Sequence, residues 1–390
     1  MAHDRTSGTN QKHQASLFSR GRVSKTLLIV APALLLPFLV LYQGDFNPAQ
    51  RDFAVLYTGG RTVLTEPAAL FNVETHTKKT ADLAARNGVN LEGSTTPWLY
   101  PATTAWLYAP FTFLSFNWAF WTMTVLNVIA LILSLHIMAG FLDTLDCRFL
   151  GLCALATPAI TGTMLHGQTA IFTLLLITLA MREKSHSRSG LWVGLLAFKP
   201  VLVLQMMGWL AIKRRWRAMA IAIGISAALA LASIATSGIT GVKDHLALLR
   251  AVGSHSLNAA EIVSQPTLAG LTMVLGLGWI GWAALAIPVG VVVVVSRGRP
   301  HFDSIALLGS ILVAPYLHNT EAGMVALLIV AGFAARGTSR IIGFCLILAA
   351  GWVTGISLLA SVAMLSAGFL YVTFQPSNWK SAEAPGHPTE

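Results

Sequence analysis

Ionisable and polar residues stand at the ends of several apolar stretches of this chain. Asp52 follows the first such stretch, and HGQT at residues 166–169, Lys199 and PYLHNTE at residues 315–321 follow later ones. Charged groups at membrane depth are costly, so these residues are candidates for function. A carboxylate can take a proton from an alcohol, and a lysine can neutralise a leaving phosphate. Brought together, they predict a group-transfer site.

Each of these residues also has a structural interpretation. Asp52 could pair with the neighbouring arginine or cap a helix. Lys199, which precedes a proline, could extend its ammonium group to the surface. His318 and Glu321 could form a structural hydrogen-bonded pair, and a lone histidine at a helix end, such as His166, is often a cap. The choice depends on whether the surrounding elements bring these side chains together.

The composition indicates a membrane protein. Hydrophobic residues make up 55% of the chain and charged residues 11%, and the mean hydropathy is +0.66. Soluble domains usually carry about 25% charged residues. The net charge of +10 resides in short basic clusters between apolar runs, which is the pattern of cytoplasmic loops and not of a nucleic-acid surface. We therefore predict a polytopic membrane protein that binds no nucleic acid.

The basic clusters set the expected topology. Residues 1–25 form a cytoplasmic tail, and the run 26–42 is expected to be a retained first helix, because no small-x-small cleavage site follows it. Later clusters lie at residues 182–188, 213–217, 297–300 and 336–340. If all of them face the cytoplasm, each stretch between them must leave the cytoplasmic side and return.

Three of these stretches are expected to form hairpins with outer tips. The stretch 149–181 has HGQT at its tip, and the stretch 304–335 has PYLHNTE. The stretch 189–212 is interrupted at Lys199, because the following proline disfavours helix at the residue before it. It forms either a re-entrant pair or a single kinked span. Arms of about ten residues cannot cross a core of about 30 Å, so they suit helices that line a cavity.

Residues 44–100 form the largest polar insertion and are expected to be the first extracytoplasmic loop. The stretch THTKKTADLAARNG predicts a short surface helix that ends at its Asn-Gly pair. Gly59 and Gly60 predict a turn that holds Asp52 at the membrane surface.

Three further expectations concern the rest of the chain. Residues 102–116, in whole or in part, do not span fully. Residues 238–265 form a second outer loop. The glycines of LGLGWIGW can break the run 267–296.

The ordered set of motifs resembles glycosyltransferase family 87, membrane proteins of GT-C fold that are similar to polyprenyl-phosphate-mannose-dependent mannosyltransferases. The likeness covers roughly residues 26–335 and rests on LYTGGRTVLTEPAALFN, WLYPATTAWLYAPFTFLS, HGQTAIFTLLLITLA, GLWVGLLAFKPVLVLQMMGWLAIKRRWRA and VAPYLHNTEAGMVALLI. It implies an all-α polytopic bundle of roughly 9–12 transmembrane or re-entrant helices. Residues 26–371 would be its single membrane-embedded domain, and residues 372–390 a short C-terminal tail.

The resemblance also implies roles for individual residues. Asp52 matches the acid of the first loop, which acts as general base on the acceptor hydroxyl. Lys199 matches the basic residue near the donor phosphate. The other expected substrate-binding residues are His318, Glu321, Gln168, His166, Asn319 and Tyr100. We expect no metal ion and no cofactor apart from the lipid-linked donor.

The expected reaction is an inverting transfer of a mannose-like hexose at the extracytoplasmic face of the plasma (inner) membrane. The donor would be a polyprenyl-phosphate sugar, and the acceptor a glycolipid or glycan. One alternative is a lipid or sugar transporter or flippase, which needs a midplane site that is reached from both sides. Another is an O-antigen-type ligase or polymerase, which usually has its large loop late in the chain.

Overall fold

The protein is all-α in the part that the structure describes. This computed structural model describes residues 23–39, 50–91, 96–140, 144–253, 265, 267–299, 302–315, 317, 319–333 and 358–374. Regular structure in these residues is helical throughout, without a strand. The prediction of an all-α polytopic bundle is confirmed.

Within the part of the chain that the structure describes, three helices are long and apolar enough to cross a membrane. They are α5 (Phe116–Ala139), the part Trp216–Ala251 of α11 (Trp216–Gly253) and α14 (Gly278–Val295). A bent pair, α6 (Thr144–Ala156) with α7 (Pro158–His166), turns by 51° and could make a fourth span. The bend falls where a proline opens the second helix, since proline disfavours helix at the residue before it.

Shorter apolar helices complete the bundle. They are Val23–Leu39, α8 (Ala170–Arg182), α10 (Pro200–Ile212), α15 (Phe302–Val313), α16 (Asn319–Phe333) and α18 (Leu358–Phe374). Helices α8 and α10 have 13 residues each, so each is about 20 Å long, less than the roughly 30 Å of a hydrocarbon core.

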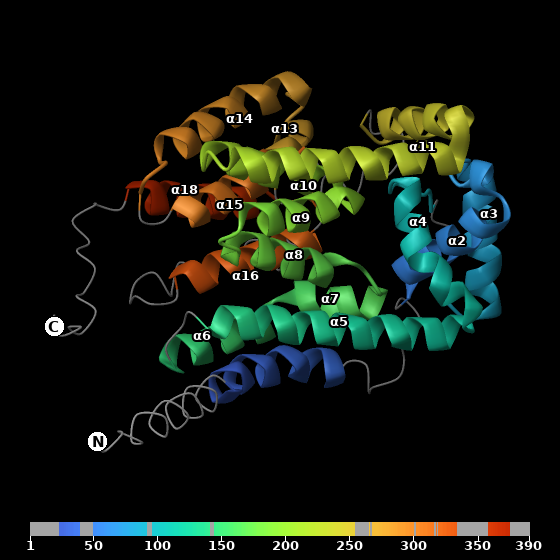
Figure 1. Ribbon diagram of the computed structural model, residues 1–390, viewed down its shortest axis with the longest axis horizontal. Helices are drawn as coiled ribbons and strands as arrows, with labels where there is room; N and C mark the ends of the chain where they lie inside the picture. The colour runs from blue at the N-terminus through green and yellow to red at the C-terminus, as the bar shows by residue number, and fades with distance from the viewer. Residues whose placement is uncertain are drawn as a thin grey trace, which may run out of the picture.

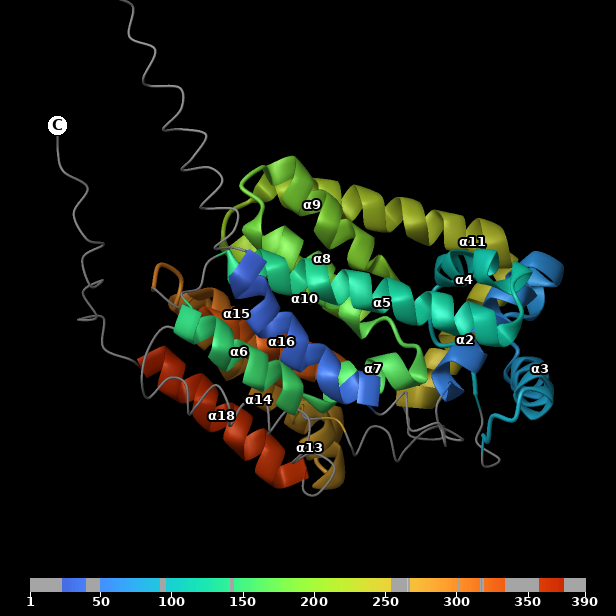
Figure 2. The ribbon, with the colours of Figure 1, turned by 90° about the horizontal axis from the view of Figure 1, so that it is seen from below.

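Neighbouring helices of the bundle pack side by side. Helix α9 (His186–Leu195) packs between α8 and α11, and α8 packs on α5 (Figures 1 and 2). Close approach is possible because glycines face the neighbouring helix. A Cβ atom on Gly194 of α9 would lie 2.7 Å from the Cβ atom of Ile225 in α11. Small residues permit such packing where lipid, not water, surrounds the helices.

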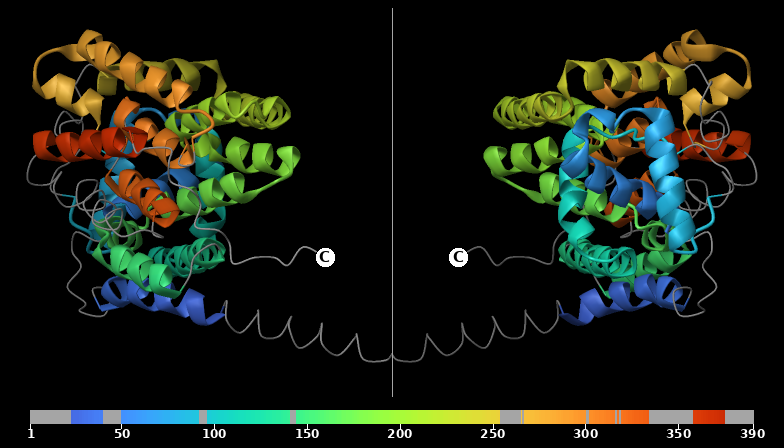
Figure 3. Two further views of the ribbon diagram at one scale, coloured as in Figure 1. Left: turned by 90° about the vertical axis from the view of Figure 1, so that its left-hand side faces the viewer. Right: turned by 90° about the vertical axis from the view of Figure 1, so that its right-hand side faces the viewer.

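The polar insertion folds into a helical unit at one end of the bundle (Figure 3, right). It contains α2 (Arg51–Thr65), a short 3₁₀ turn at Pro67–Ala69 and α3 (Val73–Arg86). The surface helix expected from THTKKTADLAARNG is α3. Its N-cap Asn72 accepts a hydrogen bond from the Thr75 amide at 2.9 Å, which satisfies one of the open amides of the first turn.

The prediction of a turn at Gly59 and Gly60 is wrong. Helix α2 runs through both glycines without interruption. A Cβ atom on Gly59 would collide with the ring of Trp98, and one on Gly60 would lie 2.7 Å from the backbone carbonyl carbon of Tyr108. The two glycines therefore let α2 pack closely against its neighbours, and they serve packing instead of chain reversal.

The segment after the insertion behaves as expected. Helix α4 (Ala102–Tyr108) and the 3₁₀ helix Ala109–Phe113 are too short to cross a membrane. The span that follows is α5. Residues 102–116 thus do not span fully, as predicted.

The expected helix breaks are present. Lys199 has φ −124° and ψ 82°, and it separates the 3₁₀ turn Leu196–Phe198 from α10, which begins with a proline. Gly276, with φ of 72°, lies between α13 (Leu268–Val274) and α14, and α14 begins at Gly278, with φ of 57°. Helices α15 and α16 form the third hairpin, packed against each other.

The prediction that residues 238–265 form a loop is wrong for residues 239–253, which are helical. Helix α11 kinks at Gly238, with φ 69° and ψ 178°, and folds back over the polar insertion (Figure 1). The His245 ring stacks on Phe71 with centroids 4.3 Å apart. This contact docks the second half of α11 on the insertion. Residues 254–264 lie outside the described residues.

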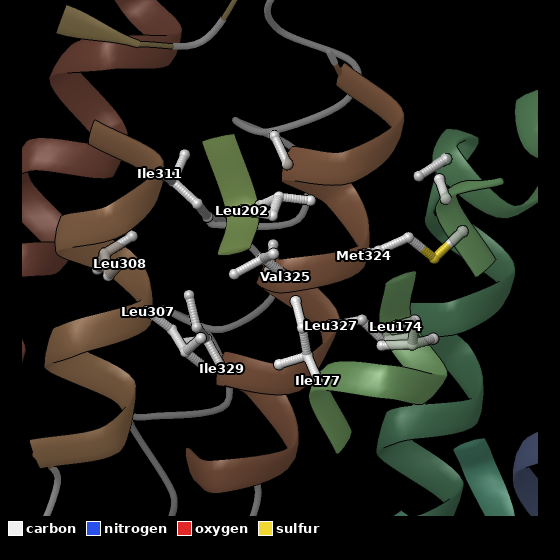
Figure 4. Packing of buried hydrophobic residues seen from close by; sticks show 14 of the residues in the cluster. Leu174, Ile177, Leu202, Leu307, Leu308, Ile311, Met324, Val325, Leu327 and Ile329 are labelled. Carbon is white, nitrogen blue, oxygen red and sulfur yellow. The ribbon is translucent and has the colours of Figure 1, made fainter. Parts of the chain in front are cut away.

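Apolar side chains hold α8, α10, α15 and α16 together in the helical bundle. Leu174 and Ile177 of α8 and Leu202 of α10 belong to one buried cluster (Figure 4). Members from the other two helices are Leu307, Leu308 and Ile311 of α15 and Met324, Val325, Leu327 and Ile329 of α16. A second buried cluster joins α2, α4 and the start of α5. Residues of the candidate site adjoin both clusters along the chain, since Asp52 precedes Phe53 of the second and Glu321 precedes Ala322 of the first.

Candidate active site

Four helix N-termini converge at the candidate site. Asp52 lies in the first turn of α2 and Glu321 in the first turn of α16. Lys199 is the N-cap residue of α10, and Gln168 lies just before α8. Helix N-termini carry partial positive charge and open amide donors, so they stabilise the two carboxylates and favour bound anions.

Asp52 is held by a neighbouring amide. Gln168 donates a hydrogen bond from Nε2 to Oδ2 of Asp52, and its Oε1 accepts one from Thr320 Oγ1 at 2.9 Å. These two bonds fix the orientation of the amide, because a flipped Gln168 would set its oxygen against the carboxylate. The second carboxylate oxygen of Asp52 is not used by this bond.

The Gly-Gln turn that carries Gln168 is determined by close packing. Gly167 has a left-handed φ of 66°, and a Cβ atom there would lie 2.8 Å from Phe53 Cβ. The Gln168 amide donates to the Thr163 carbonyl at 2.9 Å, and its own carbonyl accepts from Asn127 Nδ2 of α5 at 3.2 Å. Glycine adopts the left-handed backbone conformation without strain and leaves room for Phe53. The turn therefore places the Gln168 side chain beside Asp52.

Lys199 and Glu321 form a buried ion pair. Lys199 Nζ lies 2.6 Å from Glu321 Oε1, and the two side chains are 12% and 3% exposed. Lys199 also donates to the Tyr100 hydroxyl at 3.4 Å, and its Nζ lies 4.9 Å from the centre of that ring. An ammonium group has three N–H donors, and among the described residues these contacts use two of them. The third can bind another acceptor, such as a phosphate oxygen.

Thr320 joins the two halves of the site. Its Oγ1 lies 3.2 Å from Glu321 Oε2 and 2.9 Å from Gln168 Oε1. The hydroxyl has one hydrogen, so these two acceptors share it. A continuous chain of polar contacts therefore runs through Asp52, Gln168, Thr320, Glu321, Lys199 and Tyr100.

The structure thus brings together most of the residues that the sequence suggested. Asp52, Gln168, Lys199, Glu321 and Tyr100 all belong to the chain of contacts. Their chemical roles stay predictions, because the contacts fix positions and not reactivity.

Among the described side chains, one suggested residue, His166, is not part of that chain. His166 ends α7, and its buried Nδ1 makes no hydrogen bond among the described residues. His318 lies outside the described residues. Asn319 begins α16, but its side chain is also outside them.

Two residues that contact the candidate site were not found from the sequence. Thr320 stands inside PYLHNTE, directly before Glu321, but a threonine there gives no signal of its own. Asn127 is fully buried in the apolar helix α5. A polar side chain within a membrane span is a functional signal in itself, and it could have identified Asn127.

The fold and the site together define a polytopic helical membrane protein with a carboxylate, an amide and a buried ion pair at one end of its bundle. The model of glycosyltransferase family 87 matches residues 98–361, most of the chain, so the protein belongs to this family. It is therefore a membrane glycosyltransferase, not the transporter or flippase of the alternative. No curated protein and no solved structure matches it.

The match covers the part of the site that follows the polar insertion. Tyr100, Gln168, Lys199 and Glu321 lie within the matched residues. Asp52 lies before them, and it joins the site through its hydrogen bond with Gln168.

Proposed function

We propose that the protein transfers a mannose-like hexose from a polyprenyl-phosphate sugar to a hydroxyl group of a glycolipid or glycan, with inversion. The observation that supports this most is the chain of contacts that links Asp52 to Lys199. It holds a carboxylate base and a buried cation in one rigid arrangement. An inverting transfer needs a base for the acceptor and a positive group for the leaving phosphate.

Asp52 acts at the acceptor. It takes the proton from the acceptor hydroxyl, whose oxygen then forms a bond to the anomeric carbon of the donor sugar. The bond between that carbon and the phosphate oxygen breaks on the opposite face. The products are the glycosylated acceptor and polyprenyl phosphate, which leaves with the bonding electron pair. Holding both substrates in this geometry supplies a large part of the barrier reduction.

Lys199 acts at the leaving group. Glu321 and Tyr100 fix its ammonium group, and its remaining N–H meets the phosphate oxygen on which negative charge develops. The N-termini of α8, α10 and α16 add positive potential at the same place. A preorganised cation in a largely buried setting stabilises the departing anion more strongly than a solvated one would.

The direction of the short helices supports an extracytoplasmic site, and we propose the plasma (inner) membrane as its location. Helix α8 begins beside Gln168 and ends at Arg182, and α10 begins at Lys199 and ends next to Lys213. The basic ends therefore lie away from the site. Basic residues collect on the cytoplasmic side, so the site faces the opposite side, with the lipid tail of the donor between helices.

We propose that no resident metal takes part. Lys199 supplies the positive charge that a divalent cation would otherwise bring to the phosphate. The transfer rate is expected to stay unchanged after treatment with EDTA and to show no rise when Mg²⁺ or Mn²⁺ is added. A rate that falls with EDTA and returns with a metal would refute this.

Asp52→Asn tests the proposal. Asparagine keeps the size of the side chain and an oxygen for the Gln168 amide, but it cannot accept the proton. We expect transfer to fall by a factor of about 10² to 10⁴, measured with purified protein, radiolabelled polyprenyl-phosphate mannose and a lipid extract from a strain that lacks the gene. Asp82→Asn, on the exposed side of α3, is the matched control. Near-wild-type transfer by the Asp52 variant would contradict the assignment.

A further inference from the structure

Tyr108 is a buried tyrosine that the proposed reaction does not yet use. It is the last residue of α4 and is 2% exposed. Its hydroxyl oxygen is buried and has no hydrogen-bond partner among the described residues. Buried tyrosine hydroxyls usually have a partner, because an unbonded buried hydroxyl costs free energy.

A nearby tyrosine shows the usual arrangement. The Tyr57 hydroxyl, on α2, donates to the Leu114 carbonyl at 2.9 Å. Both tyrosines belong to the same apolar cluster. The described part of the fold therefore provides a hydrogen-bond partner for the Tyr57 hydroxyl. The Tyr108 hydroxyl is left to bond a group from outside it.

Helix packing places Tyr108 beside the helix that carries the base. The Tyr108 backbone meets α2 at Gly60, where a Cβ atom would lie 2.7 Å from the Tyr108 carbonyl carbon. Asp52 and Gly60 are separated by about 12 Å along that helix and by about 80° around it. Helix α4 therefore packs along α2, and it begins just after Tyr100, which belongs to the chain of contacts.

The electrostatics of Tyr108 agree with this placement. Burial raises the pKa of Tyr108 well above its ordinary value, and its interactions with Tyr100 and with the Asp52 carboxylate raise this pKa further. The phenol therefore stays protonated at neutral pH and keeps its O–H available as a donor. It lies within electrostatic reach of the base at the Asp52 end of the contact chain.

We propose that Tyr108 is an acceptor-binding residue that donates a hydrogen bond to a second hydroxyl oxygen of a sugar acceptor. This hydroxyl would neighbour the one that Asp52 deprotonates, so the inference rests on the proposed function. It gives the acceptor chemistry as a polyhydroxylated group and not a simple alcohol. A site that is built to bond a hydroxyl rejects analogues without it, so Tyr108 contributes to acceptor specificity.

Tyr108→Phe and Tyr57→Phe form a matched pair of variants. Each removes one oxygen from the same cluster, but only Tyr57 has a structural partner. We expect the melting temperature of ligand-free Tyr108→Phe to stay level or rise, and that of Tyr57→Phe to fall. With labelled polyprenyl-phosphate mannose and the lipid extract as probes, Tyr108→Phe should lower kcat/KM for the acceptor about tenfold. The donor KM and the kcat/KM of Tyr57→Phe should stay unchanged.

Two results would overturn the inference. One is a fall in melting temperature for Tyr108→Phe equal to that for Tyr57→Phe, because the hydroxyl would then have a structural partner. The other is an unchanged kcat/KM for the acceptor. Both results are distinct from failure of the proposed function. That failure would appear as near-wild-type transfer by the Asp52→Asn variant. If wild-type protein transfers nothing from the mannose donor, the sugar is wrong, and the stability comparison still judges Tyr108.

Discussion

The ammonium group of Lys199 lies 2.6 Å from a carboxylate oxygen of Glu321, in a pair whose side chains are both largely buried. Removing one partner leaves the other as an uncompensated buried charge. We expect Lys199→Met or Glu321→Leu alone to destabilise the protein by about 3–5 kcal/mol. The double variant should recover most of this loss. Thermal unfolding in detergent measures the stability of the three variants. The double variant should recover stability but should not transfer sugar.

An exposed ion pair provides the control. Lys79 and Glu66 are 2.8 Å apart, with side chains 33% and 61% exposed. Removing either is expected to change stability by less than about 1 kcal/mol, because water screens such pairs. If the double variant at the buried pair were no more stable than its two single variants, the two charges would not be compensating each other.

Thr320 is expected to act as a positioning residue. Thr320→Val removes the hydroxyl that joins Gln168 to Glu321. We expect kcat to fall by about 10²-fold, because small displacements of reacting groups cost that much, with the donor KM unchanged. Thr320→Ser keeps the hydroxyl and should restore the rate.

A double variant at Thr320 and Gln168 tests whether the two side chains act together. Gln168→Leu should have an effect similar to that of Thr320→Val, and the double variant should be little worse than either one. Residues that act through one hydrogen-bonded unit show such non-additive effects. A fully additive double variant, or a serine variant as slow as the valine variant, would argue against a shared role.

Gly60 is expected to tolerate no side chain. A Cβ atom there meets the backbone of Tyr108, which cannot move aside as a flexible side chain would. Gly60→Ala should therefore cost about 1–3 kcal/mol and shift α4 away from α2. Gly224→Ala is the control, since a Cβ atom on this helical glycine of α11 meets nothing within 4 Å. It should be neutral or stabilising by up to about 1 kcal/mol. Equal effects of the two substitutions would contradict the close packing.

His76 makes the stability of the polar insertion depend on pH. It is fully buried in α3, and burial lowers its pKa to about 4, although the hydrogen bond with the Thr96 carbonyl opposes the shift. An unfolded histidine binds its proton near pH 6.5, so the unfolded state binds more protons between these values. Stability is therefore constant above about pH 6.5 and falls toward pH 4, by about 3 kcal/mol in all.

Denaturation of purified protein at pH 7, 5.5 and 4.5 measures this effect. His76→Gln should flatten the dependence in this window, and His186→Gln should leave it unchanged, because His186 is exposed. A wild-type protein whose stability does not fall between pH 6.5 and 4 would show that His76 does not remain neutral in the fold.

The sequence alone determined the all-α membrane architecture and the helix break at Lys199. Apolar runs, basic clusters and the Lys199-Pro200 pair act locally, through hydrophobicity and the missing amide of proline, so they can be read along the chain. The order of the motifs identified the family. The same local logic placed Asp52, Gln168, Lys199 and Glu321 at ends of apolar elements, which made them candidates.

Only the tertiary structure decided how these residues connect. The bond from Gln168 to Asp52 joins residues that are 116 positions apart, and the one from Thr320 to Gln168 joins residues that are 152 apart. Such contacts follow from which helices pack together, and a one-dimensional pattern does not contain this information. Gly59 and Gly60 show the same limit. A glycine pair by itself predicts a turn. In this fold the two glycines are required because Trp98 and Tyr108 approach the helix too closely for a side chain.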